Sequence, residues 1–211
     1  MRIRAVALFA SLCGALGMAW DARSGPAEAS AEPSFFEQRA EFRKMRDELD
    51  AARGELDLAH MQLERWNRIY NFSSRYKIGA DLAAAIYDVS LAEGLEPELG
   101  FRLVRVESEF NEHATSPVGA VGLTQVMPAT AKYFVKDASK EKLYDRQTNL
   151  RVGFRYLRTL IREYKGNVNL ALLVYNRGPQ AVETLRALGM NPSNGYERMV
   201  MKGYSGKGTI D

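Results

Sequence analysis

The stretch RVESEFNEHATSPVGAVGLTQVMPATA, residues 105–131, decides the fold and indicates where the chemistry lies. The apolar spacing that leads into it predicts a half-buried helix ending near Glu107. That spacing comes from three residues: Leu99, Leu103 and Val106. Beyond the helix, Gly119 and Gly122 allow the backbone to approach a ligand closely, and Pro128 suits the first turn of a new helix. We therefore expect a cleft that contains a single carboxylate.

Length and composition bound the remaining possibilities. The chain has 211 residues, of which 46% are hydrophobic, enough for one good core and an appendage. Its 29 basic and 26 acidic residues give a formal net charge of +3, which is a mild excess. Because no basic block interleaved with aromatic residues is present, we expect no nucleic-acid partner.

Residues 1–29 have the pattern of an export signal. Arg2 and Arg4 form a positive start, and an apolar run extends over 5–19. This run is shorter than the ~20 residues that a spanning helix needs, which favours removal, after residue 19 or 29, over permanent anchoring. The single cysteine, Cys13, lies within the run, so the mature chain would contain no disulfide. We predict a periplasmic or otherwise extracytoplasmic protein.

A long helix is expected over residues 30–72. Its apolar residues recur every seven positions, with a second series three residues after the first. The first series is Phe35, Phe42, Leu49, Leu56, Leu63 and Tyr70, and the second is Gln38, Met45, Ala52, Ala59 and Trp66. One interpretation is a coiled coil, serving a homodimer or an envelope protein partner through residues 34–70; the other is an amphipathic helix folded back on the next domain. The strict seven-residue period favours the coiled coil.

Residues 73–203 are predicted to form one all-α domain, because no convincing strand alternation appears. Helices are expected over residues 81–93, 97–109, 128–135, 149–164, 169–176 and 180–188. The glycine-rich residues 204–211 are expected to form a flexible tail.

The chemistry available to this domain centres on a carboxyl group. His60 and His113 are the only histidines and no third ligand follows at a workable spacing, so we expect no metal site. No glycine-rich phosphate loop is present either, and we expect no cofactor. A glutamate at the end of an apolar helix would be partly desolvated, which raises its pKa and suits a general acid. A second carboxylate usually assists glycoside cleavage, but Glu109 and Glu112 need not face the same cleft.

Three motifs extend this interpretation. The first is Glu107-Ser-x-Phe-Asn-x-x-Ala-x-Ser-x-x-Gly-Ala-x-Gly-Leu-x-Gln-x-Met-Pro-x-Thr-Ala131, the second Asn149-Leu-x-x-Gly-x-x-Tyr-Leu157, and the third Ala171-Leu-Leu-Val-Tyr-Asn-x-Gly-Pro179. In this order they resemble the signature of soluble lytic transglycosylases, relatives of goose-type lysozyme. The resemblance implies a lysozyme-like helical fold that cleaves the bond between N-acetylmuramic acid and N-acetylglucosamine in peptidoglycan. It implies Glu107 as acid and then base, with a 1,6-anhydro ring as product.

The resemblance also implies roles for further residues. Ser116, Gln125 and Met127 would line the sugar cleft, and Tyr175 with Asn176 would lie near the acid. The family's late Glu-Thr-x-x-Tyr-Val segment is reproduced only in its tyrosine, Tyr196, which we place on the far rim of the cleft. Ser108 would either support the helix end or contact sugar, and Thr124, where the family usually has methionine, would lie beside the cleft.

A second functional hypothesis belongs to a different class. The chain could be an assembly or docking subunit of an envelope machine, with weak or vestigial wall-cleaving activity. The long heptad-patterned helix motivates this alternative.

Overall fold

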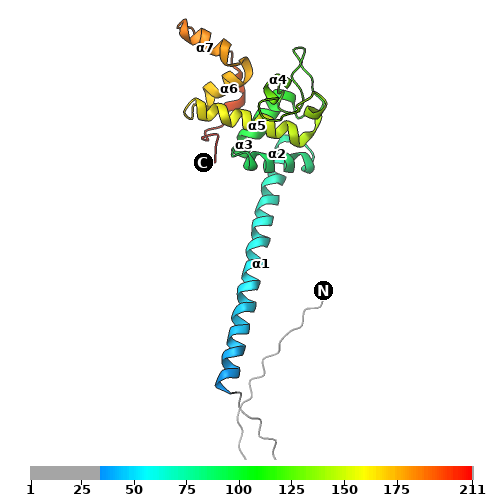
Figure 1. Cartoon of the computed structure of the whole chain (residues 1–211), viewed down its shortest axis with the longest axis vertical. Coiled ribbons are helices and arrows are strands. Elements are labelled where there is room, and N and C mark those ends of the chain that lie inside the picture. The colour runs from blue at the N-terminus through cyan, green and yellow to red at the C-terminus, as the bar shows by residue number, and fades with distance from the viewer. Residues whose placement is uncertain (1–33, 211) are drawn as a thin grey trace, which may run out of the picture. The chain divides into compact units, whose positions relative to one another are not determined.

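The computed structural model describes residues 34–210, which form helices joined by loops (Figure 1). The expected export signal, residues 1–29, lies outside this range. The described residues divide into two units, 34–54 and 55–210. Among the described residues, no helix combines the length and the hydrophobicity needed to cross a membrane.

The long helix predicted from the heptad pattern is present as α1, Phe35–Tyr76. It begins with a capping box, in which the backbone N–H of Ser34 donates to Glu37 Oε2 at 2.7 Å and the N–H of Glu37 donates to Ser34 Oγ at 3.4 Å. In the first unit the heptad residues are exposed: Phe35 is 65%, Phe42 68% and Leu49 51% exposed. The first unit therefore carries an uncovered apolar stripe.

In the second unit, the last turns of α1 pack through a face different from that stripe. Ile69 is buried, and the Phe72 and Phe101 rings stack with centroids 4.1 Å apart. Tyr76 stacks on the same Phe101 ring at 5.4 Å. The heptad residues of this unit, Leu63, Trp66 and Tyr70, remain exposed. Within residues 55–76, the heptad stripe is therefore not the packing surface.

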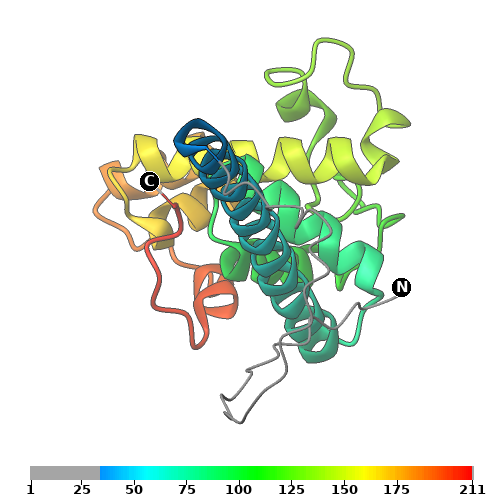
Figure 2. The ribbon, with the colours of Figure 1, turned by 90° about the horizontal axis from the view of Figure 1, so that it is seen from below.

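The core of the second unit is built around α5, Arg146–Glu163. Figures 1 and 2 show α5 running across the domain, with α4 towards its first residues and α6 and α7 towards its last. Asp145 caps α5 by accepting a hydrogen bond from the N–H of Thr148 at 2.8 Å. The other helices are α2 Ala80–Ala92, α3 Pro97–Ser108, α4 Pro128–Ala131, η1 Lys142–Tyr144, α6 Val168–Arg177, α7 Pro179–Ala187 and α8 Tyr196–Met201. The all-helical prediction is confirmed.

The C-terminal residues 204–210, expected to be a flexible tail, are hydrogen-bonded to the turn between α2 and α3. The N–H of Glu96 donates to Gly208 O at 2.9 Å, and the N–H of Ile210 donates to Gly94 O at 3.3 Å. Tyr204 donates its hydroxyl to Glu96 Oε2 at 2.7 Å. Glu96 thus connects this segment to the start of α3.

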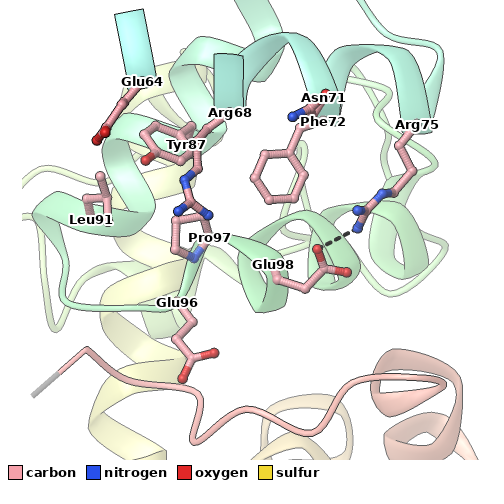
Figure 3. A pocket seen from close by; sticks show the side chains of 10 residues that line it. All are labelled: Glu64, Arg68, Asn71, Phe72, Arg75, Tyr87, Leu91, Glu96, Pro97 and Glu98. Atoms are coloured by element: carbon pink, nitrogen blue, oxygen red, sulfur yellow. Dashed lines mark hydrogen bonds and ion pairs between the residues drawn. The ribbon is translucent and has the colours of Figure 1, made fainter. Parts of the chain in front are cut away.

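A groove of about 610 Å³ lies among the last turns of α1, α2 and the start of α3 (Figure 3). Its lining mixes charges of both signs, and Arg75 donates to Glu98 Oε2 at 2.7 Å across it. None of the motif residues singled out in the sequence lines this groove.

Candidate active site

Glu107 lies in the last turn of α3, just after the buried residues Leu103 and Val104. The helix ends at Ser108, and its C-cap residue Glu109 adopts the left-handed conformation (φ 51°), so that the chain turns away shortly after Glu107. The carboxyl group of Glu107 is half-buried, and its burial raises the pKa to about 7. A carboxyl group with this pKa holds a proton up to neutral pH, which is what a general acid requires.

Tyr196 is the direct hydrogen-bond partner of this carboxyl group. It opens α8, its side chain is buried, and its hydroxyl donates to Glu107 Oε1. This bond favours the ionised carboxylate and opposes the effect of burial on the pKa of Glu107. Burial, together with the neighbouring carboxylate, raises the pKa of Tyr196 well above its usual range, so the phenol keeps its proton and remains a donor. The sequence placed this tyrosine on the far rim, whereas the structure places it against the acid.

Tyr175 and Asn176, at the end of α6, lie in different surroundings. The hydroxyl of Tyr175 donates to Thr124 O at 2.8 Å, and its ring packs on Tyr156 with centroids 5.2 Å apart. Burial raises the pKa of Tyr175 well above its usual range, and the charge of Glu107 adds to this, so its hydroxyl lies within electrostatic reach of the acid. Asn176 is exposed and accepts a hydrogen bond from Asn194 Nδ2 at 2.9 Å.

Ser116 and Gln125 brace residues 114–126, between α3 and α4, which we call the glycine-rich segment. Ser116 Oγ accepts from the N–H of Ala120 at 3.0 Å, and Gln125 Nε2 donates to the carbonyl oxygens of Ala114 and Gly122 at 3.2 and 2.9 Å. These bonds use the amide protons of Gln125, so its carbonyl oxygen is the group it can offer to a sugar hydroxyl. Met127 is the residue directly before α4, and it is 38% exposed.

Ser108 joins the acid-bearing helix to this segment. Its hydroxyl bonds to Leu123 O at 2.8 Å and to Val104 O at 3.2 Å. Of the two roles considered from the sequence, support of the helix end is the one that the contacts show. The residue after the acid thereby fixes the distance between α3 and the glycine-rich segment.

Comparison with known proteins identifies this arrangement. The family model described as "Transglycosylase SLT domain" matches residues 85–194, which cover Glu107, Gln125 and Tyr175. The chain belongs to the transglycosylase SLT domain family. The resemblance stated from the motifs is thus confirmed.

Individual relatives match this chain over part of its length. The soluble lytic murein transglycosylase of Escherichia coli K12 is 38% identical over 88 residues, which are 39% of this chain and 14% of that protein. The transglycosylase of Enterobacteria phage PRD1 is 43% identical over 84 residues, 40% of this chain and 30% of the phage protein. The crystal structure of the 70 kDa soluble lytic transglycosylase of E. coli superposes with a TM-score of 0.51 at 27% identity, covering 62% of this chain and 24% of that one. The chain therefore spans less than a third of the length of these relatives.

The side-chain amide of Asn149, a residue of α5, is buried and holds the glycine-rich segment of the SLT domain. The sequence alone assigned no role to this residue. Asn149 Oδ1 accepts from the N–H and from the hydroxyl of Thr124, both at 2.8 Å. Its Nδ2 donates to Val121 O and Leu143 O, each at 2.8 Å. Thr124 was expected beside the cleft, but it is fully buried on this amide. The sequence signal that could have indicated this contact is the spacing of Asn149 and Gly153 in the second motif.

Two glycines of the SLT domain are required by this packing. A Cβ on Gly122 would lie 2.3 Å from Asn149 Nδ2, and a Cβ on Gly153 would lie 2.3 Å from Thr124 Oγ1. Larger residues at either position would push the glycine-rich segment off α5. The glycines of the first two motifs therefore serve close packing, in addition to any approach to a ligand.

Glu112 and Glu109 are the two other carboxylates close to Glu107 in the sequence. Glu112 receives two hydrogen bonds from Arg146, at 2.9 and 2.6 Å, and Arg146 also donates to Asp81 at 2.9 Å. Glu109 is exposed at the end of α3. Of these three carboxylates, Glu107 is the one that a tyrosine hydroxyl contacts and whose pKa burial raises.

Proposed function

We propose that the chain is an exported peptidoglycan lytic transglycosylase that cleaves the β-1,4 bond between N-acetylmuramic acid and N-acetylglucosamine. The observation that carries the proposal is the half-buried Glu107, with its raised pKa, within an SLT domain. The names of the E. coli relatives, which describe action on murein, support the same substrate class.

In the proposed mechanism Glu107 acts twice. The protonated carboxyl group donates its proton to the glycosidic oxygen as the bond from that oxygen to C1 of the muramic acid breaks. The carboxylate then takes the proton from the 6-hydroxyl of the same sugar. The oxygen of that hydroxyl bonds to C1 and so closes the 1,6-anhydro ring. The proton is returned to Glu107, and no water is consumed. The hydroxyl of Tyr196 donates to the carboxylate between the two steps, when that group is charged.

The glycan strand is proposed to bind along the glycine-rich segment and α6. Ser116, Gln125 and Met127 would contact it from one side, and Tyr175 and Asn176 from the other. Tyr196 completes this set beside the acid. No cofactor or metal takes part in the proposed reaction.

We assign the parts of the chain as follows: an export signal over 1–29, the long helix over 30–72, the catalytic domain over 73–203 and the C-terminal segment over 204–211. The mature chain would work outside the cytoplasm, where peptidoglycan lies. The exposed heptad stripe on α1 supports a partner contact through residues 34–70, in a homodimer or with an envelope protein. It also favours the second candidate function, a docking subunit of an envelope machine whose cleaving activity is weak.

Mass spectrometry of muropeptides tests the reaction. Purified sacculi digested with the protein should release products that end in 1,6-anhydro-muramic acid, because the 6-hydroxyl replaces water as the nucleophile. Products with reducing ends would show a hydrolase instead. Absence of any soluble product would favour the docking subunit.

The pH dependence of cleavage should report the balance between burial and the Tyr196 hydrogen bond. The free enzyme needs protonated Glu107, so kcat/KM should fall as the pH rises through about 7. The substitution Tyr196→Phe removes a bond that lowers this pKa, so the falling limb should move to higher pH. The profile of kcat/KM against pH, measured on soluble glycan fragments, checks both expectations.

Tyr175→Phe is the matched control for this measurement. It removes a buried phenol hydroxyl that bonds to Thr124 O and not to Glu107. It should therefore leave the falling limb close to its wild-type position, even if it lowers the rate. A limb that moves equally in both variants, or in neither, would contradict the role given to Tyr196.

A further inference from the structure

The charged residues beside the heptad stripe of α1 repeat with the same period as the stripe. When Phe35, Phe42 and Leu49 are placed at position a of the heptad, position g holds Glu41 and Glu48. Position e holds arginine in three successive heptads, at Arg39, Arg46 and Arg53. One edge of the stripe is therefore acidic and the other basic. All of these residues lie in the first unit of the chain.

We propose that this part of α1 pairs with a second copy of the same chain as a parallel, in-register coiled coil. In a parallel pair, position g of one helix faces position e of the following heptad on the other. Glu41 would then face Arg46 of the second copy, and Glu48 would face Arg53 of the second copy. Each contact occurs twice by symmetry, which gives four pairs of opposite charge, while the third arginine, Arg39, would face the uncharged Ser34 of the second copy.

The same charges oppose an antiparallel pair. There, position e faces e and position g faces g, so arginines would face arginines and glutamates would face glutamates. Like charges at such positions are destabilising. The pattern therefore selects one orientation, and it is complementary to itself, which makes a second copy the partner that fits.

The apolar seam is available for this contact in the described structure. Phe42 is 68%, Met45 53% and Leu49 51% exposed, although all three are at positions a or d. A stripe of this kind is expected to be covered in the working protein. Ala52, at position d, is small enough to allow the two backbones to approach closely.

Sedimentation of charge-reversed variants tests the pairing. The purified chain should have the mass of a dimer. Glu41→Arg with Glu48→Arg should weaken self-association on the order of a hundredfold, and so should Arg46→Glu with Arg53→Glu, because four attractive pairs become repulsive. An equal mixture of the two variants should recover dimers. A monomeric wild type, or a dimer indifferent to these changes, would overturn the proposal.

The matched control is Arg43→Glu with Lys44→Glu, which reverses two charges at positions that do not face the partner helix. Its dimer should be as stable as that of the wild type. Lys44 Nζ lies 3.9 Å from Glu48 Oε1 in the same helix. Both side chains are mostly exposed, so losing this ion pair should change the stability of the dimer little.

Disulfide trapping tests the orientation separately. In a Cys13→Ser background, Leu49→Cys should form an intermolecular disulfide on mild oxidation, because identical a positions face each other in a parallel, in-register pair. Asp47→Cys, at the outward position f, should not. A dimer in which Leu49→Cys stays unlinked would overturn the parallel register. These measurements do not involve wall cleavage, so their outcome is independent of the muropeptide test.

Discussion

Glu107→Gln is expected to lower the rate of wall cleavage at least about a thousandfold, because the amide can neither donate the proton nor recover it. The side chain keeps its size, so binding of the glycan strand should change little. The measurement is the release of muropeptides from sacculi, together with co-sedimentation of the variant with the same sacculi. A variant that retains substantial activity would show that the acid is a different residue.

The same substitution is expected to stabilise the fold above neutral pH. The pKa of Glu107 is raised from 4.5 to about 7, so its protonated form favours folding fully below pH 4.5. That contribution is lost as the pH rises through 7, where ionisation of the buried carboxyl opposes folding. Glu107→Gln removes this penalty, so its free energy of unfolding should match that of the wild type at pH 4 and exceed it at pH 8 by up to about 3 kcal/mol.

Glu109→Gln is the matched control for both measurements. It replaces an exposed carboxylate two residues further along the same helix end. Its activity should stay close to that of the wild type, and its free energy of unfolding should change by less than about 0.5 kcal/mol at either pH. A gain in stability shared by both variants would indicate a general charge effect instead of the burial of Glu107.

Asn149→Ala should strongly destabilise the SLT domain although it leaves Glu107 untouched. It leaves the N–H of Thr124 and the carbonyl oxygen of Leu143 without their hydrogen-bond partner, whereas Val121 O keeps the N–H of Val126 at 3.2 Å. Each unsatisfied buried group costs about 1–3 kcal/mol, so we expect a loss of about 4 kcal/mol in the free energy of unfolding. Denaturant unfolding measures it.

Gln147→Ala is the control for this change, since Gln147 is exposed in the same first turn of α5. Its effect should be within about 0.5 kcal/mol. A loss in Asn149→Ala no larger than in Gln147→Ala would mean that water satisfies the buried groups, and that the amide does not hold the glycine-rich segment.

The sequence predicted the acid and its helix because the information is local. Apolar spacing, a turn-prone segment and Pro128 follow one another along the chain, and the ordered motifs point to the family. The helical content was predictable for the same reason. The start of α5 was placed at residue 149 instead of 146 because the cap formed by Asp145 and Thr148 was not recognised.

The surroundings of the acid could not be predicted in the same way, because they come from distant segments. Tyr196 reaches Glu107 from 89 residues away, and its helix α8 has only six residues, too few for a periodic pattern. Thr124 was expected beside the cleft, because its buried partner, Asn149, lies 25 residues further on and was not foreseen. The extension of α1 to Tyr76 likewise depends on tertiary contacts with Phe101.

The contact between Glu107 and Tyr196 has a consequence for the order in which the protein acquires its activity. Synthesis proceeds from the N-terminus, so Glu107 emerges 89 residues before the tyrosine that completes its surroundings. In the unfolded chain the carboxyl group faces water and has its ordinary pKa of 4.5, so it has lost its proton at neutral pH. The raised pKa on which the proposed reaction depends therefore arises only in the folded domain, when the late segment has packed onto the early one.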